Sequence, residues 1–201
     1  VFPYYYAHLG DLARACAEAE KGAQLAKRIG NGVDESIGLY MQGLIAHWRG
    51  EYERAVALQQ QALLVSQTSG FPIDALPLAM MGAAYLEFGD RYFDKVVELH
   101  TRAVQAMDNP IVAATSAPAR AEFGWCLVAM GKVDQAVQQF EIGSSYPSFL
   151  GLLAKPRLLA GSALVALARK QLDDAAQLIG DARTFAEDRA MKFDYPFVAL
   201  A

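Results

Sequence analysis

The sequence predicts an all-α fold, an α-α superhelix (solenoid) of about five helical hairpins. The first observation behind this prediction is a short pattern of glycine and alanine that recurs about every 40 residues along the 201-residue chain. The second is that apolar residues follow helical spacing, whereas the period-two alternation of a strand never persists. The third is a composition with 54% hydrophobic and 20% charged residues, which is typical of a globular chain rather than a disordered one.

Each copy of the pattern begins with an anchor residue. Three copies have a glycine, a polar residue, a bulky apolar residue and, after two more residues, an alanine: Gly10–Ala15, Gly50–Ala55 and Gly131–Ala136. A fourth begins at Gly89 and contains a two-residue insertion, and the fifth has Lys170 in the glycine place. The anchors at 10, 50, 89, 131 and 170 are 40, 39, 42 and 39 residues apart. This regularity indicates copies of one structural unit.

The anchors predict the turn inside each hairpin. Glycine adopts the left-handed conformation that ends a helix at low cost, so each anchor is expected to end a first helix. Small residues seven positions earlier would let two helices approach closely, at Gly43, Gly82, Gly124 and Ala163. Prolines, which lose no hydrogen bond at the start of a helix, recur at Pro77, Pro118, Pro156 and Pro196. One hairpin cannot cover its own apolar face, so neighbouring hairpins are expected to stack.

No linker-like or low-complexity segment interrupts the chain, which predicts a single repeat domain over residues 1–201. The predicted repeats cover roughly 1–30, 31–70, 71–109, 110–147 and 148–190, and a sixth starts at 191–201. Both ends are aromatic and apolar and neither resembles a polar capping helix. We therefore expect this chain to be an excised fragment of a larger protein that continues in both directions. We also expect it to form a homodimer through its exposed ends.

Two segments, Gly43–Ala55 and Gly82–Asp90, resemble the tetratricopeptide repeat (TPR). That family places small residues where Gly43, Ala55 and Ala62 stand, and a tyrosine where Tyr85 stands. The period here is near 40 residues rather than the family's 34, and the early tryptophan is missing. Long, alanine-rich repeats of this kind are similar to the C-terminal helical arrays of bacterial LuxR-type and maltose-regulator-type transcription activators and ATPase–cyclase fusions. The resemblance implies a protein-binding domain in signalling or transcription regulation.

The resemblance also implies a concave groove lined by first-helix residues. Carried over position by position, the groove candidates are Tyr40, Leu44, His47, Trp48, Leu86, Trp125 and Arg157. Such a groove is apolar and would suit a helical or hydrophobic peptide of a protein partner. The competing interpretation is that Tyr40, Trp48 and Trp125 only pack between repeats. Two further functions stay open: a small-ligand sensor that uses His47 and Tyr40, and a self-associating scaffold.

The sequence contains no pattern that predicts catalysis, a cofactor or a metal. No phosphate-binding loop, dinucleotide fingerprint, zinc-protease motif or nucleophile elbow is present. The three histidines fall in three different repeats, so a shared metal site is not expected. The carboxylate pair Asp173–Asp174 lies in strongly polar sequence, which favours a solvated helix face over acid–base catalysis. We expect no enzymatic activity, no cofactor and no metal.

Charge and apolar patterning limit the partner classes. The formal net charge is −4 and the basic residues are scattered, so direct nucleic-acid binding is not expected. We expect no apolar run to approach the roughly 18–20 residues that cross a bilayer, so no membrane association is predicted. Cys16 and Cys126 lack metal-site spacing and are expected to be small buried hydrophobes. Their use fits a reducing cytoplasm, which is the predicted location.

Overall fold

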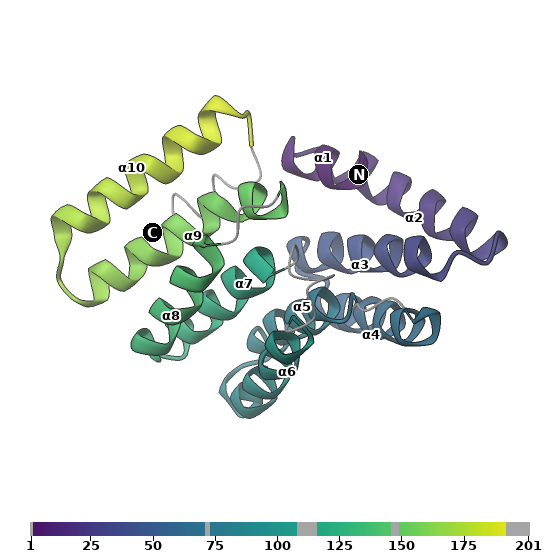
Figure 1. Ribbon diagram of the computed structural model, residues 1–201, viewed down its shortest axis with the longest axis horizontal. Helices are drawn as coiled ribbons and strands as arrows, with labels where there is room; N and C mark the ends of the chain where they lie inside the picture. The colour runs from purple at the N-terminus through teal and green to yellow at the C-terminus, as the bar shows by residue number, and fades with distance from the viewer. Residues whose placement is uncertain (1, 71–72, 108–115, 146–148, 192–201) are drawn as a thin grey trace. The chain divides into compact units, whose positions relative to one another are not determined.

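The computed structural model describes residues 2–70, 73–107, 116–145 and 149–191 (Figure 1). Within these ranges the chain forms ten α-helices, one short 3-10 helix (η1) and no strand. Their bounds are α1 Phe2–His8, α2 Leu12–Arg28, α3 Gly32–Trp48, α4 Tyr52–Ser69, α5 Ala75–Leu86, η1 Asp90–Tyr92, α6 Phe93–Ala106, α7 Ser116–Ala129, α8 Val133–Ser144, α9 Phe149–Ala168 and α10 Leu172–Asp188. Ten helices in five consecutive pairs confirm the predicted all-α fold of about five hairpins.

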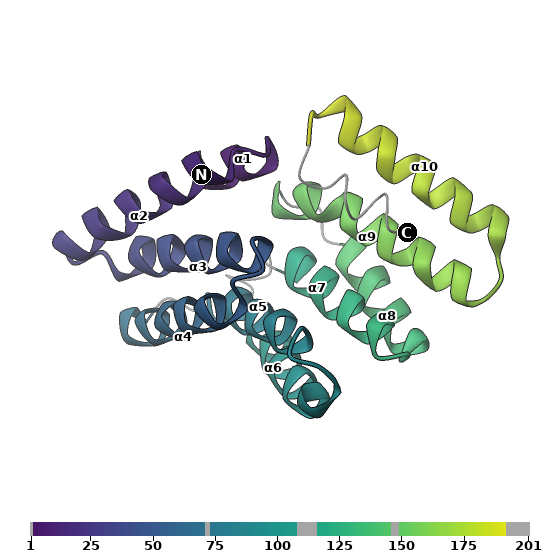
Figure 2. The same cartoon turned by 180° about the vertical axis from the view of Figure 1, so that it is seen from behind.

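The chain divides into two compact units. Unit 1 comprises residues 1–7 and 11–113, and unit 2 comprises residues 8–10 and 114–201. In unit 1 each helix from α2 to α6 packs against the next one along the chain (Figures 1 and 2). In unit 2 the same holds from α7 to α10, and α7 also packs against α9. The single repeat domain predicted from the sequence stays a prediction.

The anchor residues end the first helix of each hairpin in the left-handed conformation. The φ angles are 83° at Gly10, 75° at Gly50, 94° at Gly89 and 74° at Gly131. Lys170, which takes the glycine place in the fifth copy, adopts the same conformation with φ of 62°. In this conformation a residue with a Cβ meets steric repulsion that glycine avoids. The turn position predicted from the spacing therefore holds even where the glycine is absent.

Replacing Lys170 with glycine is expected to stabilise unit 2 by about 0.5–1 kcal/mol. The substitution removes the strain of a left-handed lysine, and the larger entropy of glycine in the unfolded chain offsets part of the gain. Urea denaturation of the full chain gives the free energy of unfolding for both proteins. The matched control is Gly131→Lys at the equivalent turn of the same unit, for which a loss of about 1 kcal/mol is expected. Equal stability of the wild type and both variants would contradict this explanation.

The two helices of a hairpin approach closely where a glycine stands seven positions before the anchor. A Cβ placed on Gly43 would lie 2.5 Å from Gln59 Nε2, one on Gly82 would lie 2.6 Å from His100 Cδ2, and one on Gly124 would lie 2.3 Å from Phe140 Cε1. Each distance is far below van der Waals contact. The residue opposite the glycine is large and fully buried in all three hairpins. The predicted role of these glycines is therefore confirmed.

Two residues differ from what the sequence predicts. Pro156, expected at the start of a helix, lies inside α9, well beyond the first turn of that helix. Cys126 is buried as expected, whereas Cys16 is only half-buried. The predicted sixth repeat at 191–201 falls almost entirely outside the described residues.

The longest helix, α9, contains an apolar segment of membrane-spanning length, which was not expected from the sequence. Within α9, the segment Gly151–Ala168 is long and apolar enough to cross a membrane by length and composition alone. The sequence pattern hides it because Lys155 and Arg157 interrupt the apolar run. In the structure 56% of this segment is buried inside the protein, and α9 packs against α7, α8 and α10. Its apolar residues therefore build much of the core of unit 2.

Candidate interaction surface

Five aromatic side chains gather where hairpins α3–α4 and α5–α6 make their turns. We call them the aromatic surface of unit 1, and its members are His47, Tyr52, Tyr85, Phe88 and Tyr92. His47 lies in the last turn of α3, Tyr52 begins α4, Tyr85 lies in the last turn of α5, and Phe88 and Tyr92 flank the Gly89 turn. All five are half-buried. The two glycine turns thus bring rings from four elements to one place.

The rings touch one another in an unbroken series. The ring centroids of His47 and Tyr52 are 5.4 Å apart, and those of Tyr52 and Phe88 are 6.4 Å apart with an interplanar angle of 89°. Phe88 then contacts Tyr85 and Tyr92 edge to face, with 5.7 Å between centroids in each pair. Edge-to-face pairs at these distances are favourable beyond the area that they bury. The rings therefore hold each other in fixed positions.

Small residues beneath the rings explain why they remain half-exposed. Ala46, Ala55, Val56 and Ala84 form a buried cluster against which Tyr85 and Phe88 pack. Alanines fill the space between the two hairpins, so the larger aromatic side chains must spread over the top of the cluster. The predicted site residues do not include Tyr52, Tyr85, Phe88 or Tyr92. The available signal was that aromatic residues flank both the Gly50 and the Gly89 turns.

An acidic group, the carboxylate of Glu87, borders the aromatic surface. Glu87, which immediately follows α5, carries its carboxylate beside the phenol of Tyr52. Burial raises the pKa of Tyr52 above its usual value, and the negative charge of Glu87 and its hydrogen bond to the phenol raise it further. Glu87 and the neighbouring Asp90 are both exposed. Tyr52 therefore stays a neutral hydrogen-bond donor at physiological pH.

The predicted groove residues of unit 1 fall into two groups. Tyr40 and Leu44 are buried, with 6% and 2% of their surface exposed. His47, Trp48 and Leu86 are half-buried. His47 belongs to the aromatic surface, whereas Trp48 packs on a separate buried cluster of Ala7, Ala15 and Ile45. Their proposed role in binding stays a prediction.

The two predicted residues in unit 2 lie together between α7 and α9. The indole nitrogen of Trp125 donates to the backbone carbonyl of Arg157 at 3.0 Å. The guanidinium of Arg157 forms an ion pair and hydrogen bond with Glu122, and both side chains are almost fully buried. Beside them, Arg120 donates to Ser116 at 3.0 Å and to Gln139 at 2.8 Å. Trp125 and Arg157 thus join the first helices of the two hairpins in unit 2.

Breaking the buried ion pair is expected to destabilise unit 2 by about 2–3 kcal/mol. In Arg157→Leu the carboxylate of Glu122 loses its cation while it stays largely removed from water. Urea denaturation measures the effect, and Asp134→Asn is the control in the same unit. That change breaks the exposed pair between Arg169 and Asp134, which should cost less than about 0.5 kcal/mol. Equal losses in the two variants would contradict a structural role for the Arg157 pair.

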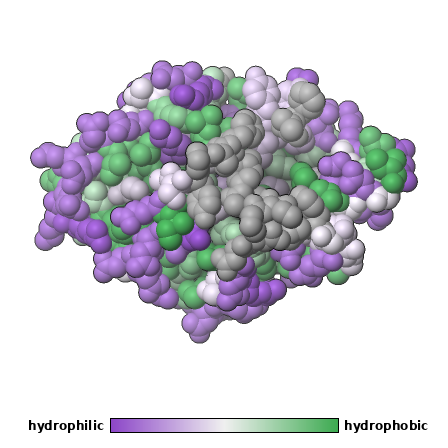
Figure 3. All heavy atoms as spheres, viewed as in Figure 1, coloured by the Kyte–Doolittle hydropathy of each residue, from purple (hydrophilic) through white to green (hydrophobic). Residues whose placement is uncertain are grey.

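The surface also contains two hollows away from the predicted groove residues. One of about 400 Å³ lies among α2, α3 and α4, and its lining includes Ala23, Leu39, Leu64 and Val65. One of about 440 Å³ lies among α8, α9 and α10, and its lining includes Val137, Val165, Leu178 and Arg169. Figure 3 shows that polar residues cover much of the visible face, with apolar patches between them. Among the described residues, no group of three or more His, Cys, Asp or Glu side chains could hold a metal ion.

The fold of this chain is similar to that of known repeat proteins. No protein-family model matches the sequence, and no curated protein matches it either. A structure of a putative kinesin light chain from Podosopora anserina, with nearly identical TPR-like repeats, is 18% identical, covers 93% of each chain and gives a TM-score of 0.51. A second structure of that protein, which carries one substitution, is 17% identical and gives a TM-score of 0.52. The match covers 94% of this chain and 92% of the other chain. This chain has the fold of the TPR-like helical-repeat proteins.

A further similar structure is YrrB, described as a TPR protein with an unusual peptide-binding site. It is 17% identical, covers 94% of this chain and 86% of its own, and gives a TM-score of 0.49. The helix lengths explain why the period of this sequence exceeds that of the standard TPR. Helices α2, α3 and α4 contain 17, 17 and 18 residues. Two such helices and their turns use about 40 residues, compared with 34 in the standard TPR.

Proposed function

We propose that this chain is a non-catalytic protein-interaction and regulatory repeat domain that binds a helical or apolar peptide of a partner protein. The observation that carries the proposal is the aromatic surface of unit 1, where five half-buried rings pack against each other in fixed positions. We also propose that the domain serves signalling or transcription regulation in the cytoplasm, which its resemblance to the repeat arrays of bacterial regulators supports.

Rigid aromatic side chains suit this task for an energetic reason. A side chain that is already held by its neighbours loses little conformational entropy when a partner covers it. Tyrosine also offers a hydroxyl for hydrogen bonding at the edge of an apolar contact, and tyrosine is enriched among the residues that contribute most binding energy. The aromatic surface contains three tyrosines and one phenylalanine whose rings contact one another. It is therefore preorganised for an apolar partner segment.

The predicted groove residues take separate roles in this proposal. His47 is part of the aromatic surface itself, and Trp48 and Leu86 extend the half-buried apolar area of unit 1. Tyr40 and Leu44, which are buried, support the first helix of hairpin α3–α4 from within. Trp125 and Arg157 hold the two hairpins of unit 2 together.

Peptide selection on the full chain tests the proposal. A phage-displayed library of random peptides supplies binders, and fluorescence anisotropy of the best synthetic peptide gives its dissociation constant. Phe88→Ala and Tyr92→Ala are each expected to weaken binding by about tenfold or more, while circular dichroism shows unchanged helix content. The control Leu64→Ala, at an exposed leucine in the hollow among α2, α3 and α4, should change binding less than about twofold. Binders that respond to Leu64→Ala and not to the aromatic variants would refute the proposed site.

A further inference from the structure

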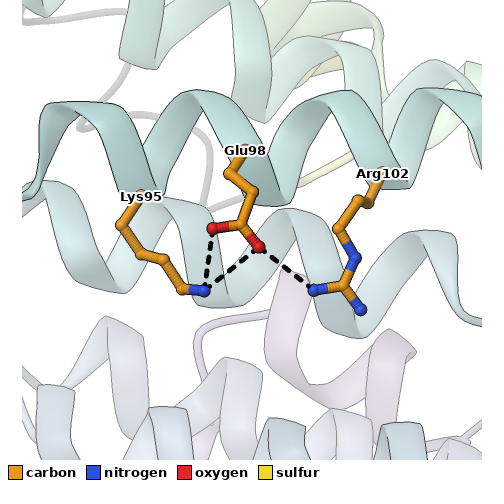
Figure 4. A network of polar contacts seen from close by, with 3 residues as sticks. All are labelled: Lys95, Glu98 and Arg102. Atoms are coloured by element: carbon orange, nitrogen blue, oxygen red, sulfur yellow. Dashed lines mark hydrogen bonds and ion pairs between the residues drawn. The ribbon is translucent and has the colours of Figure 1, made fainter.

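Acidic side chains around hairpins α3–α4 and α5–α6 differ in whether the chain itself neutralises them. On α6 the carboxylate of Glu98 accepts from Lys95 at 3.0 Å and from Arg102 at 3.4 Å (Figure 4). At the start of α4, Glu51 lies 2.7 Å from the guanidinium of Arg54. Glu87 and Asp90 have no lysine or arginine partner among the residues that the structure describes. Two acidic residues without an ion-pair partner in the described part of the chain therefore lie in the segment that carries Phe88 and Tyr92.

Glu87 is exposed, and its carboxylate lies beside one ring of the aromatic surface. Its negative charge helps to raise the pKa of Tyr52, a member of the aromatic surface that begins the second helix of the neighbouring hairpin. Asp90 belongs to η1, the same short helix that contains Tyr92. The two acidic residues flank Phe88 and Gly89 in sequence. A partner segment that covers Phe88 and Tyr92 therefore meets the short stretch of chain that carries both acidic residues.

The rings of this chain also accept guanidinium groups. The guanidinium of Arg91 lies over the ring of Tyr92 at 5.0 Å from its centroid. In the first hairpin the guanidinium of Arg14 lies over Tyr6 at 4.0 Å. A cation over an aromatic face is attracted by the negative charge density of that face. The aromatic surface therefore combines apolar contact, cation-accepting ring faces and carboxylates that are not neutralised.

We propose that the peptide partner is basic: an arginine or lysine meets Glu87 and Asp90 while an adjacent apolar side chain packs on Phe88 and Tyr92. This inference rests on the proposed function, and it adds the charge of the partner. A basic segment supplies the cations that the two carboxylates lack, whereas an acidic segment would be repelled by them. Arginine suits the place better than lysine, because its planar guanidinium stacks on rings and pairs with carboxylates at the same time.

A pair of charge-reversed peptides tests the inference on the full chain. Both are amphipathic helices with the same apolar face, and the arginines of one are replaced by glutamates in the other. The arginine peptide is expected to bind at least about tenfold more tightly at low ionic strength, and less so at about 0.15 M salt. Glu87→Gln should weaken binding of the arginine peptide about three- to fivefold, and Glu87→Lys should weaken its binding further. Both substitutions are at an exposed position and leave the core intact.

The matched control is Glu20→Gln, which removes the same charge from an exposed position on α2. This substitution should change the dissociation constant of either peptide by less than about twofold. If both peptides bind equally and both are lost in Phe88→Ala, the charge inference is wrong while the proposed function stands. If neither peptide depends on Phe88, the proposed function and the inference both fail. A loss of the arginine peptide in Glu20→Gln equal to that in Glu87→Gln would also overturn the inference, because the effect would then come from net charge alone.

Discussion

Replacing Phe140 with alanine is expected to lower the free energy of unfolding of unit 2 by about 3–5 kcal/mol. The ring of Phe140 is fully buried and fills the space left by two glycines. A Cβ on Gly124 or on Gly161 would lie 2.3 Å from this ring. Removing the ring leaves a cavity between α7, α8 and α9 that the rigid helices cannot close. Urea denaturation of the full chain measures the loss.

A double-mutant cycle shows whether the ring and the glycine act as a pair. Gly124→Ala alone should cost about 1–3 kcal/mol, because the new methyl group overlaps the ring of Phe140. In the Phe140→Ala background the same change should cost less than about 1 kcal/mol, because the space is then open. Circular dichroism checks that the variants remain helical. Strictly additive losses would mean that the close approach of Gly124 to Phe140 does not limit packing in unit 2.

Acidification is expected to destabilise unit 1 through His100. This side chain is 0% exposed and lies against Gly82 between α5 and α6, and burial lowers its pKa from 6.5 to about 3. Between these two pH values the unfolded chain binds a proton at His100 and the folded chain does not. The contribution of neutral His100 is therefore complete above pH 6.5 and is lost as the pH falls toward 3. The expected slope is at most about 1.4 kcal/mol per pH unit.

The variant His100→Gln isolates this effect from the carboxylates that also titrate in acid. Glutamine is the residue that faces Gly43 in the preceding hairpin, so the position accepts it. The free energy of unfolding of the wild type, relative to that of the variant, should fall by about 2 kcal/mol between about pH 6.5 and pH 5. A difference that stays constant over this range would show that His100 takes up its proton in the folded protein as readily as in the unfolded chain.

The spacing of glycines predicted most of the fold because it reflects a backbone requirement. A left-handed residue must follow the first helix of each hairpin, and this holds at Lys170 as well as at Gly50. The two-residue insertion after Gly89 also appears in the structure, as the 3-10 helix Asp90–Tyr92 before α6. The length of α9 was not predictable in the same way. Its extra N-terminal residues precede Pro156, and nothing in the local sequence pattern says where that helix begins.

The candidate site was less predictable because it depends on how closely helices pack. The family positions placed the candidates on α3, α5, α7 and α9. In the structure Tyr40 and Leu44 are buried and the indole of Trp125 donates to the carbonyl of Arg157. Side-chain exposure follows from distances between hairpins, which periodicity does not contain. The aromatic surface arises for the same reason: alanines at the hairpin contact leave the rings of Tyr85 and Phe88 partly uncovered. The aromatic residues that flank the two glycine turns are visible in the sequence, but the distance between the two turns is not.

Hydrogen exchange of the full chain with and without the selected peptide shows where on the protein the peptide binds. The amides of a bound segment exchange more slowly because the complex must open before they can react. Binding at the aromatic surface is expected to slow exchange in residues 45–54 and 84–94, which contain the two turns that carry this surface, with little change in α2 and α10. Protection confined to residues 20–27 and 61–65 would instead place the peptide at the hollow among α2, α3 and α4, and the aromatic surface would not be the binding site.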